Sequence, residues 1–376
     1  MDADVLIIGA GVAGLSLGAA LAPYRSVLVL EAEDASGYHS SGRSAAFSHF
    51  GIGNQRVRAL TAASRAFFEQ LPLPGETPLA KRASALFIAT EVMLPELEQL
   101  ADIVSPFAPN LTRCDEAQMQ RLFPPLRTGP EAAVAGLLDP KGFRIGSAAL
   151  LQAYARRIKS NGGTILTGRR VDAISFGADG WRVACGDASH AAPILINAAG
   201  AWADQIASLA GVAPLGLSPL RRTIIVVDPP TGADVFAWPF VKTVVDDFYM
   251  LPEGGRLMAS PVDEVPAEPG DAQPDDYDIA LAAAKVEQYT TLPVGRIAHR
   301  RAGLRTFAAD RTPVIGFDPR APSFFWCAGQ GGFGLQTAPA LADAAAALLL
   351  GRPWPQPLAA QGVHAHGLSP ERLIHG

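Results

Sequence analysis

The sequence predicts a mixed α/β (α+β) fold with two domains, one assembled from distant parts of the chain and the other inserted into it in two segments. Two observations predict the first domain: a glycine-rich turn between an apolar strand and an apolar helix stands near the N-terminus, and a second such turn stands towards the C-terminal end. A third observation concerns the inserted segments. Their short stretches of alternating polar and apolar residues predict a mostly antiparallel sheet.

The N-terminal turn reads Gly9-x-Gly11-x-x-Gly14. Its first glycine permits a tight turn, its second lets the backbone approach a pyrophosphate, and its third lets helix and strand pack closely. Glu31 follows at the spacing where a carboxylate accepts hydrogen bonds from ribose hydroxyls. We therefore predict a Rossmann-type dinucleotide site, with a purely structural glycine turn as the alternative. The elements around the turn are predicted as strand, helix and strand over residues 5–8, 12–21 and 27–30.

Two further segments indicate which cofactor binds. Residues 36–46 form a loop of glycine, serine and one arginine, Arg43, which suits the wrapping of a planar ring and its pyrophosphate. The second glycine turn, residues 329–334, opens an alanine-rich helix whose N-terminal dipole can stabilise negative charge on a reduced ring. A nicotinamide dehydrogenase normally needs one such turn. Two distant turns favour a larger cofactor held at both ends, and FAD fits.

The remaining elements are expected in the following order. Helices are predicted over residues 56–71, 93–101, 115–122 (capped by Asp115), 147–158, 279–292 and 335–350. Strands are predicted over 84–89, 164–166, 171–176, 181–185, 194–202, 223–227, 248–251, 256–259 and 323–327. Prolines break the chain over 72–78, and the acidic stretch 263–278 is expected to be a solvated loop. These elements predict an FAD-binding domain of residues 1–80, 141–215 and 301–376, and a substrate-binding domain of residues 81–140 and 216–300.

Composition argues against several classes of protein. Hydrophobic residues make up 49% of the chain and charged residues 18%, which indicates a compact globular protein. The net charge of −5, without a basic run, argues against nucleic acid as a partner. No apolar run reaches the ~20 residues that span a bilayer. We expect a cytoplasmic protein, with peripheral contact at the inner membrane left open.

The cysteines give no sign of a metal site or a covalent link. Cys114, Cys185 and Cys327 are far apart and match no metal or redox spacing, so buried thiols in a reducing compartment are expected. Cys327 stands in the strand before the second glycine turn, where no attachment motif is found. We therefore expect FAD to be bound non-covalently and no metal to be bound.

Longer motifs add a resemblance to a known family. They cover residues 37–46, 57–68, 197–202, 214–217 with 221–222, 302–305 and 330–337. Through them the sequence resembles the D-amino-acid oxidase superfamily of flavoproteins, and within it the bacterial FAD-dependent D-arginine dehydrogenases, over nearly the whole chain. The resemblance implies oxidative deamination of a D-amino acid, in which a hydride passes from Cα to flavin N5 and the imino acid is then hydrolysed. Electrons would leave to a quinone or another acceptor.

The resemblance also implies the residues of the site. Arg222 and Arg305 would hold the substrate carboxylate, which agrees with the two parallel hydrogen bonds that a guanidinium offers a carboxylate. Tyr249 would border that carboxylate, the carbonyl of Gly332 would accept from the amine, and His49 is a candidate for the catalytic base. Cofactor contacts are expected from Gly9, Gly11, Gly14, Glu31, Ala32, Ser41, Arg43, Ser44, Ala45, Ala46, Val171, Ala199, Gly200, Trp202, Gly303, Gly331, Gly332, Gly334, Leu335, Gln336 and Thr337.

Three departures from the family pattern concern the side-chain pocket. The chain has Phe47 where an active-site histidine is expected and Ile52 where a tyrosine is expected. The family's glutamate that pairs with the substrate guanidinium aligns near Ser84 or Ala85, and no acid lies between residues 81 and 90. Because a buried cation without its carboxylate partner loses several kcal/mol, we expect poor use of D-arginine and D-lysine and a preference for apolar or neutral D-amino acids.

Other activities remain open at this stage. A glycine- or sarcosine-type oxidase that makes hydrogen peroxide, and a 2-hydroxy-acid dehydrogenase of the same fold, would use the same carboxylate clamp. A flavin-binding module without activity is a further alternative, and removal of Arg305 would distinguish it from an enzyme.

Overall fold

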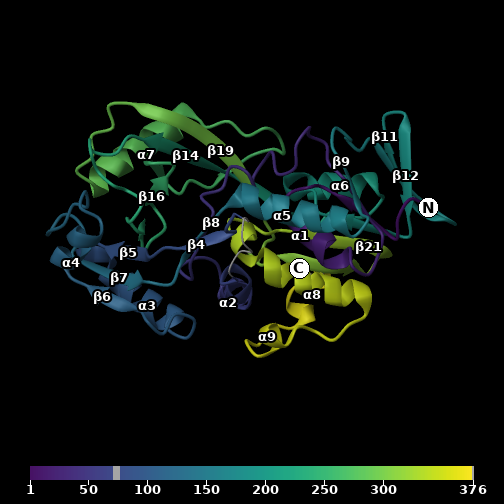
Figure 1. Ribbon diagram of the computed structural model, residues 1–376, viewed down its shortest axis with the longest axis horizontal. Coiled ribbons are helices and arrows are strands. Elements are labelled where there is room, and N and C mark those ends of the chain that lie inside the picture. The colour runs from purple at the N-terminus through teal and green to yellow at the C-terminus, as the bar shows by residue number, and fades with distance from the viewer. Residues whose placement is uncertain (71–76, 375–376) are drawn as a thin grey trace.

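The computed structural model describes residues 1–70 and 77–374 and shows two sheets side by side with helices around them (Figure 1). The N-terminal and C-terminal segments lie together in one half of the molecule. Residues from about 80 to 140 and from about 218 to 307 build the other half. This arrangement confirms a mixed α/β fold in which a mostly antiparallel domain is inserted in two segments. The break predicted at residues 72–78 lies largely outside the described residues.

The first sheet has the order β20-β21-β13-β1-β2-β9, and all its pairings are parallel except that of β20 with β21. Its strands β1 (Val5–Ile8) and β2 (Val27–Leu30) are fully buried, as expected of parallel strands covered on both faces. Both have the predicted bounds. The other strands are β9 (Thr164–Leu166), β13 (Ile194–Asn197), β20 (Val314–Asp318) and β21 (Ala321–Ala328).

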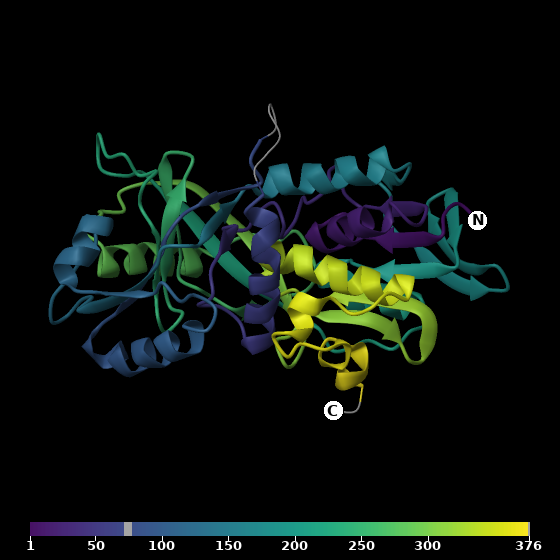
Figure 2. The same ribbon diagram turned by 60° about the horizontal axis from the view of Figure 1, so that its bottom comes forward.

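Different elements cover the two faces of this sheet. Helices α1 (Val12–Leu21), α5 (Ser147–Ser160) and α8 (Gly334–Leu350) run side by side on one face (Figure 2). Because α1 is buried by α5, α8 and the sheet, it is apolar on nearly all sides. The other face packs against α6 (Ala203–Leu209) and a small antiparallel sheet. That sheet consists of β10 (Ala173–Gly177), β11 (Gly180–Cys185) and β12 (Ala188–Ala192), of which the last was not predicted.

The second large sheet has the order β18-β14-β17-β16-β15-β5-β7-β6, and β19 pairs along the other side of β14. Only the pairing of β5 with β15 is parallel. The predicted domain boundary at residue 301 falls inside β19. The strands are β5 (Ala85–Ala89), β6 (Thr112–Cys114), β7 (Ala135–Asp139), β14 (Ser218–Val227), β15 (Phe240–Thr243), β16 (Tyr249–Glu253), β17 (Arg256–Ser260), β18 (Val265–Pro266) and β19 (Ile297–Phe307).

Residues of this second sheet alternate between two environments. One face packs against α4 (Glu116–Leu122) and α7 (Asp276–Tyr289) through residues such as Ile225, Val241 and Met250. The opposite face carries Ile224, Phe240, Tyr249 and Met258. Since successive side chains of a strand point to opposite faces, neighbouring residues face the helical layer and the interior of the molecule in turn.

Smaller elements join the two halves. Strand β8 (Phe143–Ile145) pairs with both β3 (Phe47–Ser48) and β4 (Ala80–Arg82), which places the segment after the cofactor loop beside the inserted domain. The predicted capping of α4 is confirmed, because Asp115 accepts from the Gln118 amide at 2.8 Å. The remaining helices are α2 (Gln55–Phe68), α3 (Leu94–Val104) and α9 (Gln356–Ala359), with short 3₁₀ turns at Glu91–Met93, Gly200–Trp202, Ala365–Gly367 and Pro370–Leu373.

Three further expectations concern the described residues. The cysteines are free and buried, and burial raises the pKa of Cys327 to about 12, so this thiol is a poor nucleophile. No helix in residues 1–70 and 77–374 is both long and apolar enough to cross a membrane. Over the same residues, no group of three or more His, Cys, Asp or Glu side chains is placed to hold a metal ion.

Gly14 should tolerate no side chain. A Cβ at this position would lie 1.9 Å from the carbonyl oxygen of Gly9, whereas a Cβ at Gly177 would meet nothing within 4 Å. We expect Gly14→Ala to reduce the free energy of unfolding by about 1–3 kcal/mol, as overpacking does, and Gly177→Ala to have little effect. Thermal unfolding of both variants beside the wild type tests this. An unchanged melting temperature for Gly14→Ala would contradict the close packing of α1 on the turn.

Candidate active site

Three adjoining cavities extend from the carboxyl ends of the first sheet to the inner face of the second sheet. We name them by their lining: the nucleotide cavity contains Glu31 and Trp202, the central cavity contains Arg43 and Gly303, and the inner cavity contains Phe240 and Tyr249. Their volumes are about 240, 120 and 50 Å³. The central cavity shares lining residues with each of the other two. The three cavities therefore adjoin one another, in the order that an extended cofactor with a small ligand at its inner end would need.

The nucleotide cavity opens at the carboxyl ends of β1, β2 and β13, where α/β sheets bind nucleotides. Glu31 is held there by two amides: its Oε2 accepts from Ala10 N–H at 2.7 Å and its Oε1 from Glu33 N–H at 3.0 Å. A carboxylate has lone pairs to spare for ribose hydroxyls beyond these bonds. The predicted cofactor residues that line this cavity are Gly9, Gly11, Glu31, Ala32, Ser41, Val171, Ala199, Gly200 and Trp202.

The central cavity brings the two glycine turns together with the serine-rich loop. Arg43 fastens that loop to the inserted domain, because its guanidinium donates to the carbonyls of Ala272 (3.1 Å) and Ala302 (3.3 Å) and pairs with Asp271. Helix α8 begins at this cavity without a side-chain cap, so its N-terminal amides and dipole face the space. Predicted residues lining it are Gly11, Ser41, Arg43, Ser44, Gly200, Gly303, Gly331, Gly332, Gly334 and Leu335.

Two of the predicted cofactor residues reach none of the three cavities. Gly14 lies beneath the first turn, where it lets α1 approach Gly9. Thr337 is buried in α8, and its hydroxyl donates to the Phe333 carbonyl at 2.9 Å. A direct cofactor contact is therefore not supported for either residue; both act on the shape of the turns. Ala45, Ala46 and Gln336 line the inner cavity.

All five residues predicted for catalysis line the inner cavity: Arg222, Arg305, Tyr249, Gly332 and His49. The register of the second sheet explains why the first three meet. In the ladder of β14 with β19, Arg222 pairs with Gly303 and Leu220 pairs with Arg305, so both arginines point to the same face. Tyr249, on β16, points to that face as well.

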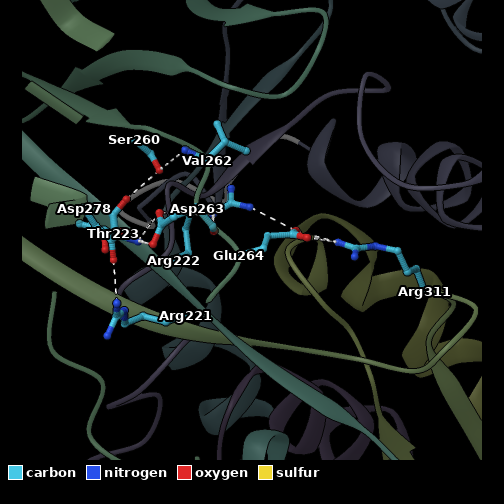
Figure 3. Close-up of polar contacts among 9 residues, drawn as sticks. All are labelled: Arg221, Arg222, Thr223, Ser260, Val262, Asp263, Glu264, Asp278 and Arg311. Atoms are coloured by element: carbon cyan, nitrogen blue, oxygen red, sulfur yellow. Dashed lines mark hydrogen bonds and ion pairs between the residues drawn. The ribbon is translucent and has the colours of Figure 1, made fainter. Parts of the chain in front are cut away.

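Arg222 is buried and rests on acidic neighbours (Figure 3). Its Nε donates to the carbonyl of Asp263 at 2.5 Å, and its Nη2 donates to Glu264 at 3.3 Å. Glu264 Oε1 also accepts from Arg311 Nη2 at 2.7 Å. Burial, followed by the neighbouring Arg305, lowers the pKa of Arg222 to about 10, which still leaves the guanidinium charged at neutral pH.

Figure 3 also shows how the next residue along β14 turns the other way. Arg221 donates to Asp278 of α7 at 2.8 Å, on the helical side of the sheet. The adjacent arginines Arg221 and Arg222 therefore have separate acidic partners on opposite faces. Only Arg222 reaches the inner cavity.

Two donors in the inner cavity have no partner in the part of the chain that the structure describes. The Tyr249 hydroxyl is buried and forms no hydrogen bond. The Arg305 guanidinium forms neither a hydrogen bond nor an ion pair with a described residue, and it lies beside Gly332, whose hypothetical Cβ would be 2.7 Å from Nη1. Donors left unpaired next to the charged Arg222 make a site suited to a carboxylate.

His49 is buried in the wall of the inner cavity and held in one tautomer. Its Nδ1 accepts from the Gly51 amide at 3.1 Å, so the proton of the neutral ring is on Nε2. The side chain of Gln336 bonds both backbone groups of His49: its Oε1 accepts from the His49 N–H at 3.2 Å, and its Nε2 donates to the His49 carbonyl at 3.3 Å. Burial, followed by the charges of Lys242, Arg58, Arg65 and Arg305, lowers the pKa of His49 well below its usual value.

Sequence reasoning missed Lys242 and Asp246, which also line the inner cavity. Lys242 stands on β15, a strand that was not predicted, and its ammonium lies 2.6 Å from Asp246 Oδ1. The departures from the family pattern predicted a less polar side-chain pocket. Phe47, Ile52 and Phe240 do provide apolar walls, but an ion pair also lines the cavity. Lys242 is the single charged residue of the run Phe-Val-Lys-Thr-Val-Val over residues 240–245, and this local sequence does not show that it faces a cavity.

Comparison with known proteins agrees with this geometry. The profile of a family described as FAD-dependent oxidoreductases matches residues 4–348. An uncharacterised oxidoreductase of Bacillus subtilis (strain 168) is 27% identical over 307 residues, which are 75% of this chain and 76% of that protein. An L-proline dehydrogenase from P. horikoshii has a TM-score of 0.82 at 18% identity and covers 100% of this chain and 98% of its own. For an iminodiacetate oxidase from Chelativorans sp. BNC1 the TM-score is 0.78, the identity 24% and the coverage 95% and 98%.

The buried, neutral His49 should make stability depend on pH. In the unfolded chain the imidazole binds a proton below about pH 6.5, whereas the folded protein does so only at lower pH. The free energy of unfolding should therefore fall as the pH drops below 6.5, by up to about 1.4 kcal/mol per pH unit. His49→Gln should lack this contribution, and the exposed His366→Gln should retain it. Thermal unfolding between pH 5 and 8 measures the slopes; equal slopes for all three proteins would mean that folding does not lower the pKa of His49.

Proposed function

The chain belongs to the family of FAD-dependent oxidoreductases, and from this we propose that it catalyses the oxidative deamination of a D-amino acid, with electrons passed on to a quinone or another acceptor. One observation carries the proposal: Arg222, Arg305 and the unpartnered hydroxyl of Tyr249 converge on a small cavity that continues into the cofactor space. This arrangement suits a carboxylate whose neighbouring carbon must lie over a flavin ring.

FAD fits the cavities that this chain forms. Glu31 stands where the adenosine ribose would lie, the backbone at Gly11 and Ser41 lines the junction where a pyrophosphate would lie, and the uncapped N-terminus of α8 faces the central cavity. The ring would be bordered by Gly303 and Gly331, which leave room for a flat group. When bound, FAD would supply the acceptor for a hydride from the substrate Cα, and the resulting imino acid would be hydrolysed by water to a 2-oxo acid and ammonia.

The protein's own residues would bind and orient the substrate. Arg305 and Arg222 would hold the carboxylate from two sides, and the Tyr249 hydroxyl would donate a third hydrogen bond to it. The carbonyl of Gly332, beside Arg305, would accept from the substrate amine. Holding the carboxylate and amine together fixes which face of Cα meets the cofactor, and the family resemblance supports the D configuration.

The bonding of His49 supports an amine substrate over a 2-hydroxy acid. A hydroxy acid must lose its hydroxyl proton to a base when the hydride leaves. The one lone pair of neutral His49 already accepts from the Gly51 amide, so this imidazole is poorly placed to take that proton. An amino acid that binds with a neutral amine needs no such base. We therefore assign His49 a role as hydrogen-bond donor through Nε2.

The walls of the inner cavity limit which substrate side chains can bind. Phe47, Ile52 and Phe240 line the inner cavity, and the nearby cations Lys242 and Arg305 repel positive charge. D-arginine and D-lysine should therefore be poor substrates, although the sequence resembles D-arginine dehydrogenases. Among the other D-amino acids, the sequence alone favours substrates with apolar or neutral side chains. A glycine-type oxidase is the alternative, and production of hydrogen peroxide in air would identify it.

Arg305→Ala provides a clean test of the carboxylate clamp. Because no described residue pairs with this guanidinium, its removal leaves no acid unpaired and relieves repulsion on Arg222, so stability and flavin content should be unchanged. Reduction of the flavin by substrate should slow by about 100-fold or more at low substrate concentration, since charged hydrogen bonds of about 1.5–3 kcal/mol each are lost. Anaerobic bleaching of the flavin absorbance measures this rate.

Arg300→Ala is the matched control. It lies on the same strand, is 62% exposed and points to the opposite face. Equal reduction rates in the Arg305→Ala, Arg300→Ala and wild-type proteins would contradict the proposed carboxylate clamp. Failure of D- and L-amino acids, glycine, sarcosine and 2-hydroxy acids alike to bleach the wild type would overturn the proposed substrate class.

A further inference from the structure

Lys242 is a buried charge that the proposed chemistry does not use. Its side chain is 3% exposed, and its ammonium has two partners, Asp246 Oδ1 at 2.6 Å and the carbonyl of Thr243 at 3.2 Å. Taking an ammonium out of water costs several kcal/mol, and an apolar residue would fill a strand position of this kind at no such cost. The position of Lys242 in the cavity wall indicates a use for its charge.

The sheet places Lys242 beside Tyr249 and three strands away from Arg222. Lys242 pairs directly with Tyr249, and Tyr249 with Ser260 of β17, while Arg222 stands on β14, on the other side of β17. With about 4.8 Å between neighbouring strands, the backbones of Arg222 and Lys242 are about 14 Å apart. Both side chains extend into the same cavity, so their charged ends can meet the two ends of one small molecule.

More cationic than acidic side chains line the inner cavity. Arg222, Arg305 and Lys242 line the inner cavity as cations, whereas Asp246 is the only acid among its lining residues, and His49 is neutral. The acids behind Arg222 are shared with Thr223 and Arg311 and do not line the cavity. Because Arg222 is already paired with Glu264 and lies near Asp263, one substrate carboxylate at the clamp balances the charge of Arg305. A second carboxylate can pair with Lys242 where it replaces Asp246.

Asp246 is a replaceable partner for Lys242. Its side chain is 54% exposed, and its backbone has a φ of 60°, which is unusual for a residue other than glycine. A carboxylate held at the solvent edge of a turn can move into water when another carboxylate takes its place. In this arrangement Asp246 compensates the charge of Lys242 until the substrate binds.

We propose that Lys242 binds a second carboxylate of the substrate, so that the preferred substrate is a dicarboxylic D-amino acid. The clamp holds the α-carboxylate, the methylene groups of the side chain contact Phe240 and Phe47, and the terminal carboxylate pairs with Lys242. This inference rests on the proposed function. It reverses the expected order of neutral and anionic side chains, because no local sequence pattern shows that Lys242 faces the pocket.

The first experiment needs only the wild-type holoenzyme. Rates of anaerobic flavin reduction are compared for D-aspartate, D-glutamate and D-2-aminoadipate, for the isosteric amide D-glutamine, and for D-norleucine. We expect the best acidic substrate to exceed D-glutamine by about tenfold or more in rate at low concentration. Comparable or faster reduction by D-glutamine or D-norleucine would overturn the role of Lys242 while the proposed function stands. Reduction by none of them would overturn both.

The second experiment measures binding without turnover. Glutarate and pentanoate have the same length and differ in one carboxylate, and their binding is followed by the shift of the flavin absorbance. In Lys242→Met, glutarate should bind about 10- to 100-fold more weakly, whereas pentanoate should change by less than about threefold. Lys285→Met, which removes a lysine paired with Asp247 outside the cavity, is the control and should bind both as the wild type does.

The pattern of losses decides between a specificity role and a structural one. Equal weakening of glutarate and pentanoate in Lys242→Met would mean that Lys242 supports the clamp or the fold, and would overturn the proposal. Lys242→Gln keeps a polar group at this position and replaces Lys242→Met in the experiment if the methionine variant does not retain flavin. It should show the same selective weakening of glutarate binding.

Discussion

The antiparallel ladder between β14 and β19 is the constraint on which the site depends. It aligns Arg222 with Gly303 and Leu220 with Arg305, and so directs two guanidinium groups to one face. A slip of one residue along β14 would send Arg222 to the helical layer and bring Arg221 into the cavity. The separate partners of these two arginines, Glu264 and Asp278, hold the register against that slip. The same ladder carries β19 from the inserted domain to the edge of the cofactor space.

Charge is distributed unequally around the inner cavity, and this distribution gives the site its chemistry. Arg222 is buried and supported by acids, whereas Arg305 has no partner among the described residues and is free for a ligand. Burial, followed by the charges of nearby cations, lowers the pKa of His49 well below its usual value. The same cations disfavour positive ligands, and this supports the proposal that the site rejects arginine and accepts anions.

The cofactor space depends on close approach of backbones. At Gly9 and Gly14 the turn and helix α1 are in contact through main-chain atoms, and the second turn brings the N-terminus of α8 to the same space. The loop that carries Arg43 then connects this space to β19. Because β19 and this loop border both the central and the inner cavities, the position of a flavin and the position of the carboxylate clamp are set by one set of contacts.

The sequence by itself determined the local elements and most of the site. The bounds of β1, α1 and β2 were predicted without error, and the five residues proposed for catalysis were found around one cavity, because glycine spacing, apolar periodicity and family motifs are local signals. Only the tertiary structure decided which side chains face the substrate. Lys242 and Asp246 lie on a strand and turn that no local pattern marked. The direction of a strand residue depends on the register with partners far along the chain, which sequence periodicity does not contain.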